Sequence, residues 1–152
     1  LGMKRFDAIF AAVCLASLSG CAALQPSPTA PEINARYDVI EAYTDAYNAR
    51  DVEAMAALMH DDIQWLSIDG ADIAVVADGK ADLVTQMTGY VASGSATTST
   101  LEGQLADGPY LAVREIARWT DGDGAQAEQS ALAVYQVDQG LVRRVWYYPA
   151  TR

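Results

Sequence analysis

The sequence has few basic residues, little cysteine and a single histidine. Ten lysines and arginines stand against 20 aspartates and glutamates in 152 residues, which gives a formal net charge of −10. Nucleic-acid binding needs clustered lysine and arginine against the phosphates, so this balance excludes that class of partner. It also argues against a polybasic contact with anionic lipid.

Motifs for metals and phosphate-bearing cofactors are also missing. One histidine without a set of free cysteines cannot form a typical zinc site. The segment Asp121-Gly122-Asp123-Gly124 lacks the further acidic ligands of a calcium loop, so it is read as a turn. No glycine-rich phosphate loop is present. We therefore expect neither a metal nor a cofactor.

The chain has no apolar run long enough to span a bilayer, which takes about 20 residues. Its longest run, from Ala8 to Leu18, follows the positively charged start Met3-Lys4-Arg5 and predicts a secretory signal over residues 1–20. The end of this run, Leu18-Ser19-Gly20-Cys21, resembles the lipobox of bacterial lipoproteins. The resemblance implies cleavage before Cys21 and lipid attachment to it; an ordinary secretory signal with an incidental cysteine is the alternative.

Residues 21–32 are predicted to be a lipidated cysteine followed by a flexible tether. Ala22 to Glu32 holds three prolines and little apolar content, and it would reach roughly 30 Å at about 3.1 Å per residue. Cys14 would leave with the signal, so no pair remains for a disulfide. Ala22 after the lipidated residue resembles the outer-membrane sorting class. We expect an exported, lipid-anchored protein that faces the periplasm from the outer membrane if the host is Gram-negative.

The remainder, residues 33–152, is predicted to be one α+β domain. Apolar residues at helical spacing predict helices over 33–49, from 52 to about 60, and from 80 to the glycine at 94. Short β-branched runs predict strands over 63–68 and 72–77. The period then changes to two, which predicts four long strands joined by Asp/Gly turns: 97–105, 109–119, 127–137 and 141–148. This order predicts helices gathered on one face of a mainly antiparallel sheet.

Particular segments of the domain resemble the nuclear transport factor 2-like (NTF2-like) superfamily, especially its bacterial SnoaL-like members. They are Tyr43 with Tyr47-Asn48-Ala49-Arg50-Asp51, Met59-His60-Asp61-Asp62-Ile63, Gly79-Lys80 and the closing hairpin. The resemblance implies a cone-shaped fold in which three N-terminal helices pack on a curved sheet around a cavity. It leaves function open, because the superfamily hosts isomerases, dehydratases, hydrolases and non-catalytic binding domains.

Strand alternation identifies Glu115 as the best candidate for chemistry. On the strand 109–119, one face is apolar except for Glu115, so that face should meet the helices and place a carboxylate in the cavity wall. Desolvation disfavours the charged form of such a group, which can then act as a base or an acid near neutral pH. The structural alternatives are an ion pair with Arg143 or hydrogen bonds to cavity tyrosines.

A resemblance to the ketosteroid isomerases adds further candidates. Their oxyanion-binding tyrosine matches Tyr43, whereas their general-base aspartate falls at Ser67 and their protonated aspartate near Ala131. Because both carboxylates are missing, that particular isomerase activity is not expected. Tyr43 either donates a hydrogen bond to a ligand oxygen or is a core tyrosine whose hydroxyl meets Glu115 or water. The predicted ligand-binding residues are Tyr43, Trp65, Ser67, Tyr90, Glu115, Gln129 and Tyr147.

The opposite face of the sheet carries aliphatic and aromatic residues that are expected to be covered rather than wet. We predict a homodimer packed through this face, with Ile116, Leu132, Val134, Trp146 and Tyr148 at the interface. His60 is predicted to lie at the end of the second helix, where a cation complements the helix dipole, rather than to act as a base.

Two functions are compatible with these features. The first is non-catalytic binding of a small, largely apolar molecule, or a structural envelope role that uses the same fold. The alternative is a cofactor-independent lyase, isomerase or hydrolase that uses Glu115 and Tyr43. A buried Glu115 without a basic partner in an open cavity would favour the enzyme. A filled cavity, or Glu115 paired with Arg143, would favour the binding module.

Overall fold

The computed structural model describes residues 27–150, so the predicted signal peptide, Cys21 and the first part of the tether lie outside the described residues. The described part contains nine elements in the order α1 (Ala30–Asn48), α2 (Val52–Ala57), β1 (Met59–Asp69), β2 (Asp72–Asp78), α3 (Lys80–Ala92), β3 (Thr98–Asp107), β4 (Tyr110–Thr120), β5 (Gln126–Asp138) and β6 (Leu141–Pro149).

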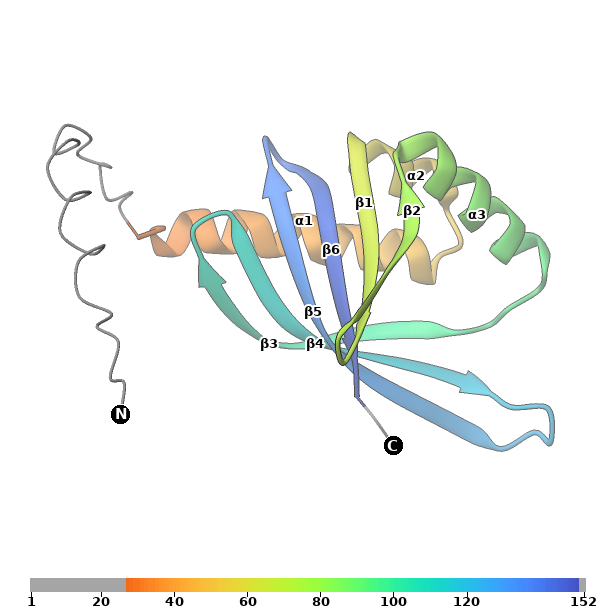
Figure 1. Cartoon of the computed structure of the whole chain (residues 1–152). Coiled ribbons are helices and arrows are strands. Elements are labelled where there is room, and N and C mark those ends of the chain that lie inside the picture. The colour runs from red at the N-terminus through yellow and green to blue at the C-terminus, as the bar shows by residue number, and fades with distance from the viewer. Residues whose placement is uncertain (1–26, 151–152) are drawn as a thin grey trace, which may run out of the picture.

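The six strands form one curved, mixed sheet in the order β2-β1-β6-β5-β4-β3. Neighbouring strands are antiparallel except for β1 and β6, which are parallel. The predicted antiparallel character therefore holds for all pairings but this one. Helix α1 runs across one face of the sheet, and α2 and α3 lie near its β1–β2 end (Figure 1). Only α1 and α2 precede the sheet, because α3 follows β2 in the chain.

Helix α1 begins three residues before the predicted start of the domain. The backbone N–H of Thr29 donates to the Glu32 carboxylate at 2.7 Å, which satisfies one of the free donors at a helix start, and Pro31 suits the first turn. The face of α1 that meets the sheet buries Ile40, Tyr43 and Ala46. This spacing of three residues is that of an amphipathic helix.

The segment around His60 differs from the prediction. Helix α2 ends at Ala57, and His60 lies in β1, where its Nδ1 accepts a hydrogen bond from the Asp62 backbone N–H at 3.1 Å. The predicted role of His60 at a helix end is therefore wrong. Met59 and Ile63 are both buried, and a spacing of four residues fits one helix face and one strand face equally well. Because Met59 pairs with Val142 on β6, the segment that begins at Met59 is a strand.

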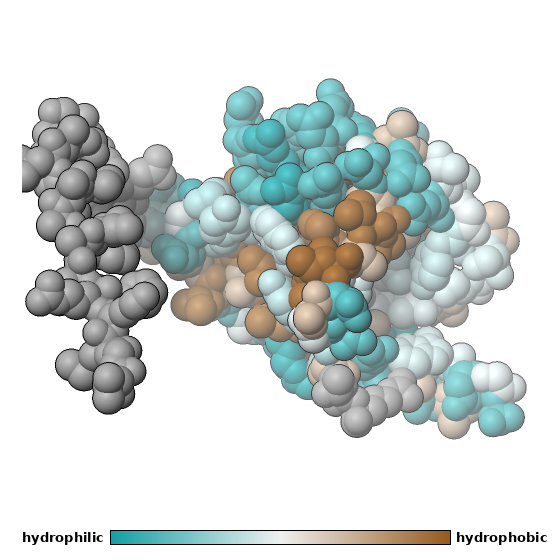
Figure 2. Space-filling view, viewed as in Figure 1, coloured by the Kyte–Doolittle hydropathy of each residue, from teal (hydrophilic) through white to brown (hydrophobic). Residues whose placement is uncertain are grey.

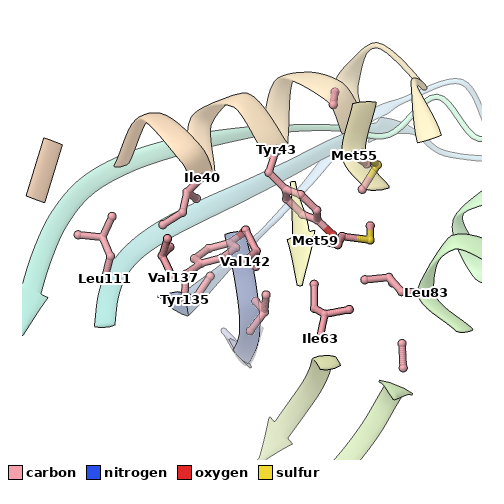
Figure 3. Close-up of a cluster of buried hydrophobic side chains, with 14 of the residues drawn as sticks. Ile40, Tyr43, Met55, Met59, Ile63, Leu83, Leu111, Tyr135, Val137 and Val142 are labelled. Carbon is pink, nitrogen blue, oxygen red and sulfur yellow. The ribbon is translucent and has the colours of Figure 1, made fainter. Parts of the chain in front are cut away.

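The core lies between the helices and the inner face of the sheet. Figure 3 shows Ile40 and Tyr43 projecting from α1 toward this face, with Leu83 of α3 farther along the same layer. The strands contribute a set of almost fully buried side chains, namely Leu111, Val113, Ala133, Tyr135, Val142 and Val145. None of the helices within residues 27–150 is long and apolar enough to cross a membrane.

The outer face of the sheet carries an apolar row that crosses all six strands. Directly paired residues place Val75, Leu66, Trp146, Val134, Ala112 and Leu105 side by side on this face. Figure 2 shows hydrophobic side chains gathered in the middle of the face seen in Figure 1. Among the residues predicted to form a dimer interface, Leu132 is 51% exposed and Tyr148 41%, whereas Ile116 is only 3% exposed within the single chain. Ile116 therefore adds little free surface.

Candidate functional site

A cavity of about 200 Å³ lies between the helices and the inner face of the sheet. Its walls come from all three helices and from five of the strands. They are mainly aromatic and aliphatic, with Tyr43, Tyr47, Met55, Trp65, Leu83, Met87, Tyr135, Val145 and Tyr147 as the large side chains. We call this space the inner cavity. Because an apolar cavity of about 150 Å³ can hold benzene, it has room for at least one ring.

A second space of about 280 Å³, the outer cavity, adjoins the inner one. The two share Trp65, Glu115, Ala117 and Tyr147 in their walls. The rest of the outer cavity is lined by Ser67, Val76, Gln129, Ser130, Ala131 and Pro149, of which Val76, Gln129 and Pro149 are exposed. The outer cavity therefore lies on the solvent side, and Glu115 stands at the junction.

Three hydroxyl groups donate hydrogen bonds to the Glu115 carboxylate. Ser99 Oγ donates to Oε1 at 2.6 Å, the Tyr135 hydroxyl donates to Oε2 at 3.1 Å, and the Tyr147 hydroxyl also donates to Oε2. The predicted alternative of hydrogen bonds to cavity tyrosines is thus confirmed. The predicted ion pair with Arg143 is wrong.

Arg143 pairs elsewhere. Its guanidinium lies 2.8 Å from Asp138 and 3.9 Å from Asp62, at the end of β5 and in β1. Within residues 27–150, no basic side chain forms an ion pair with Glu115. The carboxylate is therefore held by neutral donors alone.

Strand register brings the groups of this cluster together. Glu115 on β4 lies opposite Ala131 on β5, and Tyr147 on β6 lies opposite Ala133. These small alanines leave room on the inner face for the larger glutamate and tyrosine side chains beside them. Tyr135 reaches Glu115 because every second residue of β5 points to this face.

Asn48 at the end of α1 positions Ser99. Its side-chain N–H donates to the Ser99 carbonyl at 2.8 Å, and its Oδ1 accepts from the Ser99 backbone N–H at 2.8 Å. β3 is an edge strand, so these two backbone groups have no neighbouring strand on that side. The amide of Asn48 takes the place of that strand and holds Ser99 Oγ at the carboxylate.

The tyrosines of the cluster stay protonated. Burial, and then the charge of Glu115, raise the pKa of Tyr43 and of Tyr135 above the ordinary value. Burial likewise raises the pKa of Tyr147, reinforced by Tyr135 and Glu115. Tyr43 is 9% exposed, and its hydroxyl, which lines the inner cavity, has no hydrogen-bond partner among the described residues. It is free to bond a ligand.

Tyr90, another predicted ligand-binding residue, lines neither cavity. Its hydroxyl accepts from Ser95 Oγ at 2.6 Å and lies 2.9 Å from the Tyr47 hydroxyl. The Arg50 guanidinium sits over both tyrosine rings, 5.2 Å from the Tyr47 centroid and 5.8 Å from the Tyr90 centroid. Burial opposes the change, but hydrogen bonds from Ser95, Thr97 and Tyr47 lower the pKa of Tyr90. Tyr90 therefore supports the wall from behind Tyr47.

The other predicted residues divide between the two cavities. Tyr43 lines the inner cavity, Ser67 and Gln129 line the outer one, and Trp65, Glu115 and Tyr147 line both. Sequence reasoning did not name Ser99 or Tyr135 as site residues. Because Leu132 and Val134 are predicted on the outer face, alternation along β5 puts Tyr135 on the cavity side, whereas nothing in the local sequence marks Ser99. No three potential metal ligands gather anywhere in residues 27–150.

Solved structures with the same fold are numerous. An LEH-like epoxide hydrolase from Mycobacterium tuberculosis is 18% identical, with a TM-score of 0.65 and coverage of 79% of this chain and 86% of that one. A proposed ketosteroid isomerase from Kribbella flavida is 23% identical, with a TM-score of 0.63 and coverage of 79% and 81%. TerC, crystallised with polyporic acid, is 16% identical, with a TM-score of 0.63 and coverage of 76% and 92%. At these identities the likeness establishes the fold alone.

Two further comparisons concern the sequence. No curated protein matches the chain. The family model of the SnoaL-like domain matches residues 40–145, from the middle of α1 into β6. That span contains every residue that lines the two cavities except Tyr147 and Pro149, which follow it in the chain. The chain therefore belongs to the SnoaL-like domain family, with its α+β, NTF2-like fold.

Proposed function

We propose that this chain binds a small, largely apolar molecule in the inner cavity without transforming it. The observation that carries the proposal is the cavity itself, which the protein's own side chains leave open beneath α1. Its walls are mostly rings and aliphatic groups, with a few placed polar groups at Glu115, Ser99 and Tyr43. This combination is typical of small-molecule sites, where apolar walls supply affinity and polar groups fix orientation.

We further propose that the protein is an exported lipoprotein held at a membrane through Cys21. The support is the apolar run that ends in Leu18-Ser19-Gly20-Cys21. In a Gram-negative host, Ala22 favours the outer membrane, with the domain in the periplasm. Metabolic labelling with a radioactive fatty acid tests this proposal: the full-length chain should take up label, and Cys21→Ser should not. Label on the Cys21→Ser variant would overturn it.

A catalytic role is the second candidate. Two features expected of an enzyme are present, because Glu115 has no basic partner in the described part of the chain and lines an open cavity, although it is half-buried rather than fully buried. The free Tyr43 hydroxyl lines the same cavity. These are the groups that a cofactor-independent lyase, isomerase or hydrolase would use as base and oxyanion donor. The fold is also that of an LEH-like epoxide hydrolase. Against catalysis, three hydroxyls already occupy acceptor sites of the Glu115 carboxylate, which leaves fewer of these sites to take a proton from a substrate.

We also propose that two copies pack through the outer face of the sheet. The exposed Leu132, Tyr148 and Val75 lie on this face. The flanking charges there are balanced, because Arg114 pairs with Glu102 at 2.7 Å and Arg118 with Glu128 at 3.2 Å. On a chain with net charge −10, such a face is where a second copy can approach without strong repulsion.

Native mass spectrometry of the full-length protein, purified in mild detergent from its own host, tests the binding function. A bound small molecule should add to the protein mass and should be lost on Trp65→Ala, which removes a wall shared by both cavities. Gln104→Ala, at an exposed position of β3, is the matched control and should retain the molecule. If the unaltered protein shows only the mass of the polypeptide with its lipid, and no bound molecule, the proposal is overturned. Recovery of a chemically converted molecule would favour the enzyme instead.

A further inference from the structure

Charge at the two cavities is supplied by one residue. Among the side chains that line them in the described structure, Glu115 is the one acidic residue, and no lysine, arginine or histidine is present. Ser99, Tyr135 and Tyr147 donate neutral hydrogen bonds to it but supply no positive charge. Glu115 is half-buried, and a charge that is partly removed from water is stabilised by a partner of opposite charge. Within the described residues, no side chain of opposite charge balances the Glu115 carboxylate in either cavity.

The carboxylate also keeps a free acceptor site. Its two oxygens together offer about four lone-pair positions for hydrogen bonds. Oε2 accepts from both Tyr135 and Tyr147, whereas Oε1 accepts only from Ser99. One position on Oε1 thus remains for a donor that enters the cavity. A charged N–H donor would make a stronger bond there than a neutral hydroxyl.

Aromatic rings surround this acceptor. The rings of Trp65 and Tyr147, 5.4 Å apart between centroids and tilted by 49°, lie in the wall shared by both cavities. Tyr43 and Tyr135 add two more rings on the inner side. The face of an aromatic ring attracts a cation, most strongly where water is excluded. Rings beside an unpaired carboxylate are a recognition pattern for an organic ammonium group.

We propose that the molecule bound by this cavity is an apolar amine whose ammonium group lies at Glu115. The inference rests on the proposed binding function and adds the chemical class of the ligand. The ammonium would donate to Oε1 at the junction of the two cavities, beside the rings of Trp65 and Tyr147. The apolar body would occupy the inner cavity against Met55, Leu83 and Met87. Carboxylate and phosphate ligands should bind more weakly, because no cationic side chain among the described residues lines either cavity.

Isothermal titration calorimetry of the full-length protein, stripped of bound molecules, tests the proposal with three probes. Phenethylamine, phenethyl alcohol and phenylacetate share one ring and a similar length and differ in charge at neutral pH. The amine should bind at least about tenfold more tightly than the alcohol, and the phenylacetate anion should be the weakest of the three. On Glu115→Gln the amine and the alcohol should bind within about threefold of each other, because the counter-charge is gone. Gln104→Ala should keep the preference for the amine.

The ratio of amine to alcohol affinity in the unaltered protein tests the inference even if Glu115→Gln does not fold. Equal affinities, or tightest binding of phenylacetate, would overturn the inference and leave small-molecule binding in place. An amine preference that survives Glu115→Gln would also overturn it. If none of the probes binds in the millimolar range, the inference fails, and the native mass spectrum decides separately whether the cavity binds another molecule.

Discussion

Removing the Asn48 amide should destabilise the domain and loosen the wall of the cavity. Asn48→Ala deletes two hydrogen bonds of 2.8 Å, one to the Ser99 carbonyl and one from its backbone N–H. Each such bond contributes about 1 kcal/mol net. Ser99 is 4% exposed, so water cannot readily replace both bonds. We expect the unfolding free energy to fall by about 2 kcal/mol.

Urea unfolding followed by tryptophan fluorescence measures this loss. With a slope of about 2 kcal/mol per molar urea, the midpoint should drop by about 1 M. Gln104→Ala on the same strand is the control and should shift the unfolding free energy by no more than about 0.5 kcal/mol. If Asn48→Ala were as stable as the control, the amide would not hold the strand edge, and the account of how Ser99 reaches Glu115 would be refuted.

Four further predictions follow from the same structure. Leu111→Ala should lower the unfolding free energy by about 2–5 kcal/mol, because Leu111 is fully buried, and a loss below about 1 kcal/mol in urea would contradict this core assignment. Leu132→Glu should yield a monomer in sedimentation velocity with unchanged circular dichroism; a dimer that persists would remove the outer face as the interface. In an absorbance titration Tyr90 should ionise below its ordinary pKa, and Tyr90→Phe should abolish that first step. Burial raises the pKa of Tyr43, Tyr135 and Tyr147, so the folded state holds protons that the unfolded chain releases near pH 10. The unfolding free energy should therefore fall as the pH rises above about 10. An unfolding free energy that stays constant to about pH 12 would contradict this.

The two faces of the sheet could be predicted from the sequence because side chains alternate along a strand. Alternation on β4 placed Glu115 with Leu111 and Val113, and all three lie on the cavity side of the sheet. The same reasoning on β5 separated Leu132 from Ala133, and the structure exposes the first and buries the second. A period of two is a property of the backbone itself, so it can be counted in the sequence without knowledge of the fold.

Partners of the charged groups could not be predicted in this way. Arg143 and Glu115 both seemed available for an ion pair, yet Arg143 meets Asp138 while Glu115 meets three hydroxyls. Which side chains lie opposite depends on strand register and on the curvature of the sheet, which involve residues far apart in the chain. The parallel pairing of β1 with β6 is of the same kind, and its first pair, Met59 with Val142, lies at the start of the strand that contains His60.

Apart from the segment around His60, the sequence by itself thus determined the element types, the α+β order, the inward carboxylate at Glu115 and the apolar outer face, because hydrophobic periodicity and turn residues act locally. It also predicted the leader and Cys21, which lie outside the described residues. Only the tertiary structure decided that Asn48 holds Ser99 beside Glu115, that Tyr43 keeps a free hydroxyl, and that two cavities meet at one unpaired carboxylate. These features depend on long-range packing of the three helices against five of the strands, where small alanines leave room for the larger side chains of the site.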